Sequence, residues 1–224
     1  MSIDLLIFDL DGTLIDSKLD LAYAVNATRA HMGLGPLDIE LVSSYVGNGA
    51  PVLIRRALGP EVSDASVQEA LTFFLEYYRE HKLDYTVLYP GVRDSLDRLR
   101  GARKRLAILT NKPVGVSRSI VQGLGLSGLF FQVYGGNSFD FKKPHPIGVE
   151  TLMAEAGIGR AATLMVGDSS VDVETARNAS VHSCGVRYGF APETLSDPAP
   201  EMLIDRMEQL VDWVLGGEQQ LINP

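Results

Sequence analysis

The chain has 224 residues, of which 46% are hydrophobic and 21% are charged, a balance typical of a folded protein with a buried core. The 28 acidic residues outnumber the 20 basic residues, giving a formal net charge of -8, so nucleic acid is not an expected partner. No apolar stretch approaches the roughly 20 residues needed to span a membrane. The single cysteine, Cys184, and the absence of a positively charged leader favour a cytoplasmic protein.

The first predicted strand is followed by an unusually long helical region. Residues 3–8 form an apolar run that predicts a buried strand. Four helical patterns then follow without an intervening strand, at residues 19–32, 39–46, 50–58 and 66–82. At roughly 150 residues per domain, the chain fits one domain with an insertion better than two full domains. We therefore expect residues 16–87 to form an inserted helical cap on a core domain made of residues 1–15 and 88–224.

Strand and helix patterns alternate through the rest of the chain. Apolar runs predict strands at residues 106–109 and 163–166, with weaker candidates at 131–134 and 181–186. Amphipathic patterns predict helices at residues 92–100, 117–124, 147–156, 171–179 and 202–215. The alternation predicts the α/β class, with a doubly wound, Rossmann-like parallel sheet as the core. Ligands of such sheets bind at the carboxyl ends of the strands, where this chain carries carboxylates, a threonine and an asparagine.

Two aspartates follow the first predicted strand directly. Asp9 and Asp11 stand two residues apart, just before Gly12. The conformational freedom of the glycine permits a sharp turn, so both carboxylates can face one pocket. A carboxylate that attacks phosphorus needs positive charge nearby, and a second carboxylate can serve as acid and then as base. Aspartates at a turn can also be simple caps, so the pair alone leaves catalysis and capping open.

A second acidic segment ends the predicted strand at residues 163–166. Asp168 would lie close to Asp9 if the two strands are neighbours. A typical Mg²⁺ site is formed by carboxylates together with a carbonyl, waters and a phosphate oxygen. Asp172 lies one helical turn beyond Asp168. It either holds a lysine or a metal-bound water, or it complements the dipole of the following helix, and the sequence does not choose between the two.

Two further strand-end segments carry groups that suit a phosphate. Thr110 and Asn111 end a strand where a helix begins, and a hydroxyl with free backbone N–H groups makes a phosphate-binding corner. Lys143 lies in a loop stiffened by Pro144 and Pro146, where its charge could neutralise both the nucleophile and the phosphate. Each residue also has an ordinary interpretation, as a strand threonine or a solvated surface lysine.

Taken in order, these residues resemble the four motifs of the haloacid dehalogenase superfamily. The matching segments, which span nearly the whole chain, are Asp9-x-Asp11-x-Thr13, Thr110, Lys143 and Gly167-Asp168-x-x-x-Asp172. The resemblance implies that Asp9 is the nucleophile, which forms an aspartyl-phosphate with Mg²⁺ bound. It implies that Asp11 is the general acid and base and gives its backbone carbonyl to the metal. Asp168 would complete the metal ligands, and the helical insertion would be the superfamily's cap.

The same resemblance implies how the phosphoryl group is held. Thr110 and Lys143 would bind it, and we place Thr13 and Asn111 among the residues that bind the substrate. The namesake dehalogenases lack the second aspartate of the first motif. The presence of Asp11 therefore implies phosphate chemistry rather than dehalogenation.

Some short segments are also similar to those of phosphoglycolate phosphatases within the superfamily. They are Val46-Gly47-Asn48-Gly49-Ala50, Thr110-Asn111-Lys112-Pro113, Lys143-Pro144-His145-Pro146 and Val186-Arg187-Tyr188-Gly189. The segment at residues 178–184 departs from the small, Ala/Gly-rich turn that is usual there. The similarity implies a phosphatase acting on a small phosphate monoester, with 2-phosphoglycolate, hydrolysed to glycolate and phosphate, as the best candidate.

Substrate choice is expected to come from the cap, because the core motifs hold only the phosphoryl group. Gly47 and Asn48 precede a helix whose N–H groups could face a carboxylate. Either Arg55 or Arg56 could reach the same pocket from this helix, although both could also be surface residues.

The sequence leaves several other functions open. Hydrolysis of pyrophosphate, nucleotides or sugar phosphates, and phosphotransfer of the β-phosphoglucomutase type, would use the same core residues. A catalytically silent phosphate-binding module is the non-enzymatic alternative, although it would gain nothing from keeping Asp9 and Asp11. The expected partner is a small-molecule phosphate ester, and the expected assembly is a monomer or a homodimer.

Overall fold

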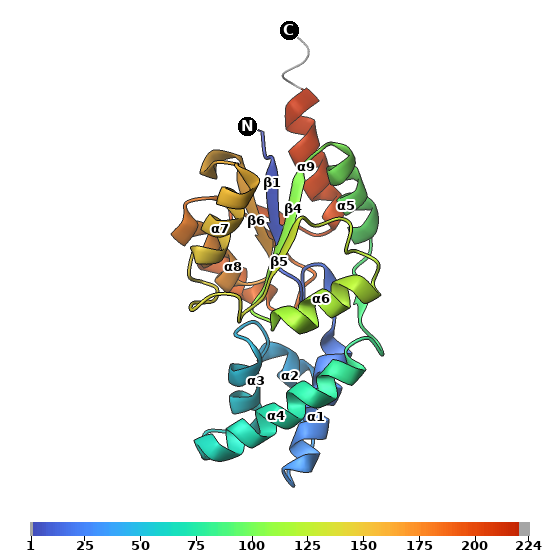
Figure 1. Cartoon of the computed structure of the whole chain (residues 1–224), viewed down its shortest axis with the longest axis vertical. Coiled ribbons are helices and arrows are strands. Elements are labelled where there is room, and N and C mark those ends of the chain that lie inside the picture. Colours follow the sequence, from blue (N-terminus) through green and yellow to red (C-terminus); the bar gives the residue numbers. More distant parts are fainter. Residues whose placement is uncertain (1, 220–224) are drawn as a thin grey trace.

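The computed structural model describes residues 2–219. It contains a six-stranded parallel sheet with helices on both faces and a separate layer of helices at one end (Figure 1). The strands of this sheet are β1 (Leu5–Phe8), β4 (Arg105–Leu109), β5 (Gln132–Tyr134), β6 (Thr163–Gly167), β7 (His182–Val186) and β8 (Met202–Ile204). Their spatial order is β5-β4-β1-β6-β7-β8. The predicted α/β class with a doubly wound sheet is confirmed.

The side chains of β1 show how the two faces of the sheet are covered. The helices that pack on the sheet are α5 (Val92–Gly101), α6 (Val114–Gly123), α7 (Ile147–Ala156), α8 (Ser170–Ala179) and α9 (Met207–Gln219). Leu6 and Phe8 pack with α5, α6 and α9, whereas Leu5 and Ile7 pack with α7 and α8. All four side chains are fully buried. Because β1 is covered on both faces, every one of its residues must be apolar, which explains the continuous apolar run in the sequence.

The carboxyl-terminal segment differs from its prediction. The sequence pattern predicts one helix over residues 202–215, but Met202–Ile204 form β8 and α9 begins only at Met207. β8 runs parallel to β7 and forms one edge of the sheet. Three apolar residues in a row fit a short strand as well as a helical turn, so periodicity alone could not separate the two. The other predicted core elements are present with ends shifted by a few residues.

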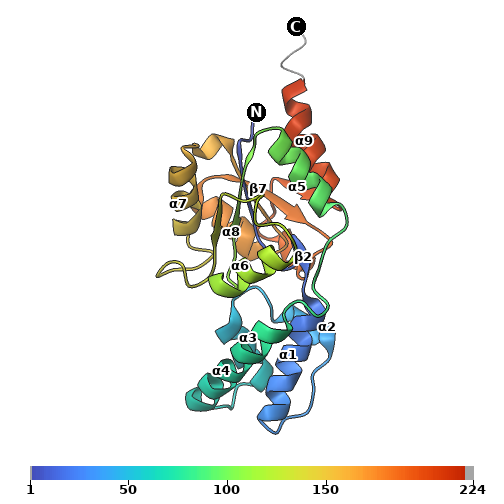
Figure 2. The same ribbon diagram turned by 45° about the vertical axis from the view of Figure 1, so that its right-hand side comes forward.

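The four helices predicted between the first two core strands form their own layer. They are α1 (Lys18–His31), α2 (Ile39–Ser44), α3 (Ala50–Leu58) and α4 (Asp64–His81). A separate hydrophobic cluster that includes Ile54 and Phe74 holds this cap together. Val116 of α6 and Phe190 contact the same cluster from the core side, and the two views in Figures 1 and 2 show the cap beneath α6.

A short two-stranded ribbon joins the cap to the sheet. β2 (Ile15–Asp16) and β3 (Val87–Leu88) pair antiparallel, so the outgoing and returning chains lie side by side. Asp20 of α1 is buried next to this ribbon and accepts hydrogen bonds from the backbone N–H groups of Tyr85 and Thr86 and from the Thr86 hydroxyl. The predicted boundaries between cap and core fall on this ribbon, and the division into two domains stays a prediction.

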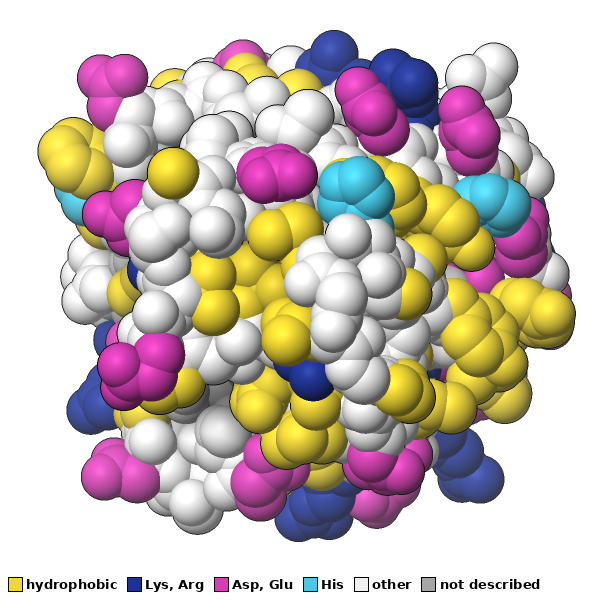
Figure 3. Space-filling view, turned by 90° about the horizontal axis from the view of Figure 1, so that it is seen from below, with side chains coloured by type: hydrophobic (Ala, Val, Ile, Leu, Met, Phe, Trp, Pro, Cys, Tyr) yellow, Lys and Arg dark blue, Asp and Glu magenta, His cyan; other side chains and the backbone are white. Residues whose placement is uncertain are grey.

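The outer surface of the cap carries charges of both signs. Figure 3 shows acidic and basic side chains interspersed around hydrophobic ones on this face, rather than one continuous basic area. Within residues 2–219, no helix combines the length and the hydropathy that a membrane crossing requires.

Candidate active site

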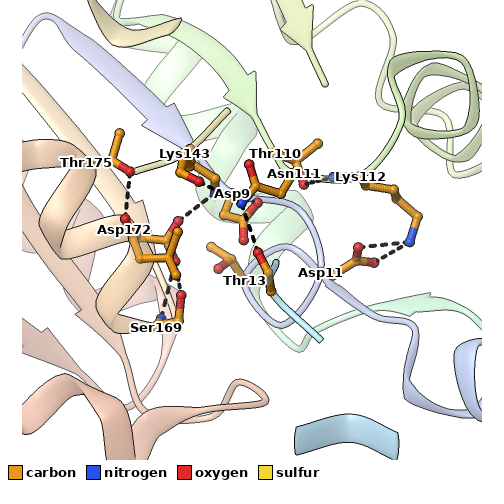
Figure 4. Close-up of polar contacts among 12 residues, drawn as sticks. Asp9, Asp11, Thr13, Thr110, Asn111, Lys112, Lys143, Ser169, Asp172 and Thr175 are labelled. Carbon is orange, nitrogen blue, oxygen red and sulfur yellow. Dashed lines mark hydrogen bonds and ion pairs between the residues drawn. The ribbon is translucent and has the colours of Figure 1, made fainter. Parts of the chain in front are cut away.

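The sheet brings the predicted strand-end residues to one edge. β1 lies between β4 and β6, and all three run in parallel, so Asp9, Thr110 and Asp168 follow adjacent strand ends. Lys143 approaches the same edge from the loop that precedes α7. Figure 4 shows Asp9 in the middle of this group, with Lys143 and Asp172 on one side of it.

Lys143 links two buried carboxylates. Its Nζ lies 2.9 Å from Oδ1 of Asp9 and 2.6 Å from Oδ1 of Asp172. The Lys143 side chain is only 2% exposed, so the structure places it inside the site rather than in solvent. Burial by itself lowers the pKa of this ammonium group, but Asp172 and Asp9 outweigh that effect and hold the pKa above its usual value. A permanent positive charge therefore lies directly beside Asp9.

Asp172 fulfils both of the roles that the sequence left open. Its Oδ2 accepts hydrogen bonds from the backbone N–H and the hydroxyl of Ser169, forming a capping box at the start of α8. Its Oδ1 accepts a hydrogen bond from Lys143. Because Asp172 is fixed to the end of a helix, it also fixes the position of the ammonium group.

Three carboxylates form a buried acidic cluster at this edge. Oxygen atoms of Asp9, Asp168 and Asp172 all lie within 4.8 Å of one another. Burial raises the pKa of Asp9 to about 6, with Asp172 adding to the effect and Lys143 opposing it. Burial, together with Asp172 and Asp9, also raises the pKa of Asp168 well above its usual value, although the N–H of Phe190 donates to it. The cluster therefore has more negative charge than Lys143 neutralises.

The acidic cluster fits a divalent cation. Carboxylate oxygens are the ligands preferred by such ions, and a bound cation would offset the excess negative charge. Both oxygens of Asp172 accept short hydrogen bonds, from Lys143 and Ser169. Oδ1 of Asp168 has only a 3.5 Å contact, from the Thr13 hydroxyl, although its Oδ2 accepts from the N–H of Phe190. Asp9 and Asp168 therefore stay the predicted side-chain ligands. The participation of the Asp11 backbone carbonyl stays a prediction.

Asp11 pairs with a lysine that the sequence reasoning did not assign. Nζ of Lys112 lies 2.8 and 2.9 Å from the two Asp11 oxygens, and the Ser17 hydroxyl donates to the same carboxylate at 2.6 Å. The ammonium also lies 4.6 Å from the ring centroid of Tyr78, which belongs to the cap. In Figure 4 the Asp11 carboxylate is turned toward Lys112 and away from Asp9. One signal was present in the sequence: Lys112 follows its strand at the same edge where Asp11 follows the neighbouring strand.

The remaining predicted core residues connect the parts of the site. The Thr13 hydroxyl lies 3.5 Å from an oxygen of Asp168, and the Thr110 hydroxyl accepts from the backbone N–H of Lys112. Nδ2 of Asn111 lies 2.9 Å from the Gly47 carbonyl oxygen and 3.1 Å from the Lys143 carbonyl oxygen. Asn111 therefore ties the cap to the loop that carries Lys143.

Comparison with known proteins agrees with this geometry. The family model for haloacid dehalogenase-like hydrolases matches residues 6–186, which include all the predicted core site residues. The chain belongs to the haloacid dehalogenase-like hydrolases. The resemblance found in its four sequence motifs is confirmed.

Relatives of this hydrolase are similar over nearly their whole lengths. A phosphoglycolate phosphatase of Vibrio vulnificus is 42% identical over 223 residues, which are 95% of this chain and 96% of the relative. A phosphoglycolate phosphatase of Colwellia psychrerythraea is 37% identical, covering 93% of this chain and 95% of the relative. The crystal structure of a predicted phosphoglycolate phosphatase from Haemophilus somnus has a TM-score of 0.89 at 30% identity, covering 95% of this chain and 98% of that one.

The cap of this haloacid dehalogenase-like hydrolase closes over the acidic edge. Gly47 lines the cavity between cap and core together with Asp9. The backbone carbonyl of Asn48 accepts from Nζ of Lys142 at 2.6 Å, and Asn48 does not line that cavity. Arg55 does not line it either, because it faces outward and pairs with Asp64. Of the three predicted cap residues, the structure thus brings only Gly47 to the cavity.

Proposed function

We propose that this chain is a Mg²⁺-dependent phosphatase that hydrolyses 2-phosphoglycolate to glycolate and phosphate through an aspartyl-phosphate on Asp9. The observation that carries the proposal is the buried Asp9 carboxylate between the Lys143 ammonium and Asp168. A carboxylate in this setting can approach a phosphate dianion, because positive charge offsets their repulsion. The curated relatives that match along almost the full chain support phosphoglycolate as the substrate.

In the first half of the reaction, an oxygen of Asp9 attacks phosphorus. The bond between phosphorus and the glycolate oxygen breaks, and that oxygen takes a proton from Asp11. Lys143 stays beside the transferring group and stabilises its charge. Because Asp11 is paired with Lys112 as a carboxylate, it must leave that pair and take up a proton from solvent before it can donate to the leaving oxygen.

In the second half, water attacks the phosphorus of the aspartyl-phosphate. Asp11 accepts a proton from this water, the bond between phosphorus and the Asp9 oxygen breaks, and inorganic phosphate leaves. Both carboxyl groups are thereby returned to the protonation states in which the attack on the substrate began. The Mg²⁺ ion, held by Asp9 and Asp168, would supply positive charge to the phosphoryl oxygens throughout.

The cavity between cap and core favours a small substrate. It has a volume of about 60 Å³ and reaches from Asp9 and Asp168 to the cap side chains Leu53 and Phe74. Since one water needs roughly 10–15 Å³, the cavity holds only a few waters in this conformation and suits a small ligand. A nucleotide would need the cap to move away from the core.

The decisive experiment measures both turnover and the covalent intermediate. Purified protein with Mg²⁺ is assayed for phosphate release from 2-phosphoglycolate and from a panel of sugar, nucleotide and other phosphate esters. With ³²P-labelled substrate, acid-quenched wild-type protein is expected to carry label on Asp9, and the Asp9→Asn variant is expected to show neither label nor turnover. Asp94→Asn, at an exposed position of α5, is the matched control and should behave as wild type. Turnover that persists in Asp9→Asn would refute the proposed nucleophile.

A further inference from the structure

The cavity extends beyond the phosphoryl site into a largely apolar space. Its walls include Leu21, Leu53 and Phe74 of the cap and Val116 of α6. A carboxylate on the leaving group would enter this space and would need a positive partner there, because an unpaired buried charge is strongly unfavourable. Among the described residues that line the cavity, Lys112 is the only lysine or arginine.

Lys112 is held rigidly for such a role. Its side chain is 5% exposed and lies between Asp11 and the ring of Tyr78. Burial alone lowers the pKa of this ammonium, but Asp11 reverses the effect and holds the pKa above its usual value. The group therefore remains a cation at the wall of the cavity, in an orientation set by the core and the cap together.

Two buried polar groups near Lys112 have a hydrogen-bonding position that no described residue fills. The Tyr78 hydroxyl interacts with the Lys112 ammonium, but its O–H has no acceptor within the described residues, and Oδ1 of Asn111 has no donor there; both residues line the cavity. Tyr78 is only 2% exposed. A hydroxyl donor buried in this way indicates that an acceptor enters the cavity from outside the chain.

The motion required of Asp11 makes room for that acceptor. When Asp11 turns toward the leaving oxygen, Lys112 loses the carboxylate that neutralises it. A carboxylate on the leaving group can take the vacated place opposite Lys112. The carboxylate of the substrate then replaces the Asp11 carboxylate as the partner of Lys112.

We propose that Lys112 and Tyr78 form the receptor for a carboxylate on the leaving group, and that they select phosphate monoesters that carry this carboxylate near the ester oxygen. This inference rests on the proposed phosphatase function and deepens it. Lys112 is a specificity-determining residue that meets the substrate directly, and the Tyr78 hydroxyl donates to the same carboxylate.

The other cations near the cap are engaged elsewhere. Arg55 pairs with Asp64, and Arg56 donates to the backbone carbonyl of Tyr45, along a hollow separate from the cavity that contains Asp9. Lys142 donates to the carbonyl of Asn48 and also lies outside that cavity. None of the three faces the space that the leaving group would enter.

The test compares 2-phosphoglycolate with ethyl phosphate, in which a methyl group replaces the carboxylate. The measured quantity is the ratio of kcat/KM for the two substrates, because general damage to catalysis cancels in it. Lys112→Met is expected to lower this ratio about 10- to 100-fold, the usual range for a lost hydrogen bond to a charged group. Tyr78→Phe is expected to lower it about 3- to 10-fold. Lys142→Met and Arg55→Met are the matched controls and should leave the ratio unchanged.

If Lys112→Met lowers kcat/KM equally for both substrates, Lys112 only positions Asp11 and the proposal is overturned. The proposal is also overturned if the kcat/KM ratio falls in Arg55→Met but not in Lys112→Met. Binding provides a second arm that needs no turnover: calorimetry of 2-phosphoglycolate and ethyl phosphate with Asp9→Asn, with and without Lys112→Met. If Lys112→Met lowers the affinity for 2-phosphoglycolate more than the affinity for ethyl phosphate, the proposed receptor is supported. If it changes both affinities by the same factor, the proposal is overturned. If wild-type protein hydrolyses no phosphate ester, the proposed function fails, while the binding arm still decides the receptor.

Discussion

Nζ of Lys143 lies 2.6 Å from Oδ1 of Asp172, and both side chains are 2% exposed. The same ammonium lies 2.9 Å from Asp9, so Asp172 determines where the positive charge beside the proposed nucleophile is placed. A lysine side chain has four rotatable bonds and is positioned only by its contacts. Asp172, anchored by Ser169 at the start of α8, supplies the shorter of the two ion-pair contacts of Lys143.

The first prediction concerns Asp172→Asn. An amide has one acceptor oxygen, so it cannot accept from both Lys143 and Ser169 as the carboxylate does. We expect kcat to fall about 10- to 100-fold, as is usual for residues that orient catalytic groups, with a smaller change in KM. Steady-state kinetics with 2-phosphoglycolate measure both constants. Glu174→Gln, at an exposed position of α8, is the control, and wild-type kinetics in Asp172→Asn would show that Lys143 needs no support.

The second prediction concerns Gly12, which has φ of +78° in the turn after β1. A Cβ there would lie 2.2 Å from Oδ2 of Asp168, so Gly12→Ala must both strain the backbone and displace that carboxylate. We expect an unfolding free energy lower by about 1–2 kcal/mol from the backbone alone. We also expect weaker Mg²⁺ binding, measured as a higher metal concentration for half-maximal rate.

Gly33→Ala separates the two effects. Gly33 has φ of +72°, but nothing lies within 4 Å of the position that its Cβ would take. This variant should lose a similar amount of stability while the metal requirement stays the same. An unchanged metal requirement in Gly12→Ala would argue against Asp168 as a ligand.

The sequence predicted the core of the site because each residue is placed by a short, local rule. Asp9 and Asp168 directly follow continuous apolar strands, and parallel strands end at one edge of the sheet. The residues that the sequence reasoning misplaced depend on longer-range contacts or on the orientation of a helix. The position of Lys112 at a strand end is visible in the sequence, but its pairing with Asp11 and its contact with Tyr78 depend on two other segments.

Arg55 is placed by the helical periodicity of α3. In α3 the buried side chains include Leu53, Ile54 and Ala57, and Arg55 falls on the exposed face between them. That spacing predicts an outward-facing arginine, which agrees with its pairing with Asp64. The strand at Met202–Ile204 could not be predicted from periodicity, because a run of this length is too short to distinguish a strand from a helix.

The third prediction concerns Asp20, which joins α1 to the chain returning from the cap. Its carboxylate accepts from the backbone N–H groups of Tyr85 and Thr86 and from the Thr86 hydroxyl at 2.7 Å. Asp20→Asn replaces one acceptor oxygen by an amide donor, which leaves at least one buried donor unpaired. We expect the unfolding free energy to fall by about 1.5–3 kcal/mol, measured by urea denaturation. Asp84→Asn, an exposed change in the same segment, should stay within about 0.5 kcal/mol of wild type, and a comparable loss there would contradict the argument.

The fourth prediction concerns pH and metal. Burial raises the pKa of Asp9 to about 6 and raises that of Asp168 well above its usual value, so both carboxyl groups hold their protons more tightly in the folded protein than in the unfolded chain. Their contribution to stability is therefore complete below the unfolded pKa of about 3.9 and is lost as the pH rises through about 6 and beyond. In the absence of metal, the acidic cluster is thus a source of instability at neutral pH.

A divalent cation reverses this effect only where the carboxylates are ionised. The increase in melting temperature on adding MgCl₂, measured against EDTA, should be larger at about pH 7.5 than at about pH 5. Potassium chloride at matched ionic strength controls for general screening of charge. In Asp168→Asn the difference between the two pH values should shrink, because one ligand and one titrating carboxyl group are gone. Equal shifts at both pH values in wild-type protein would mean that the stabilising ion binds somewhere other than the acidic cluster.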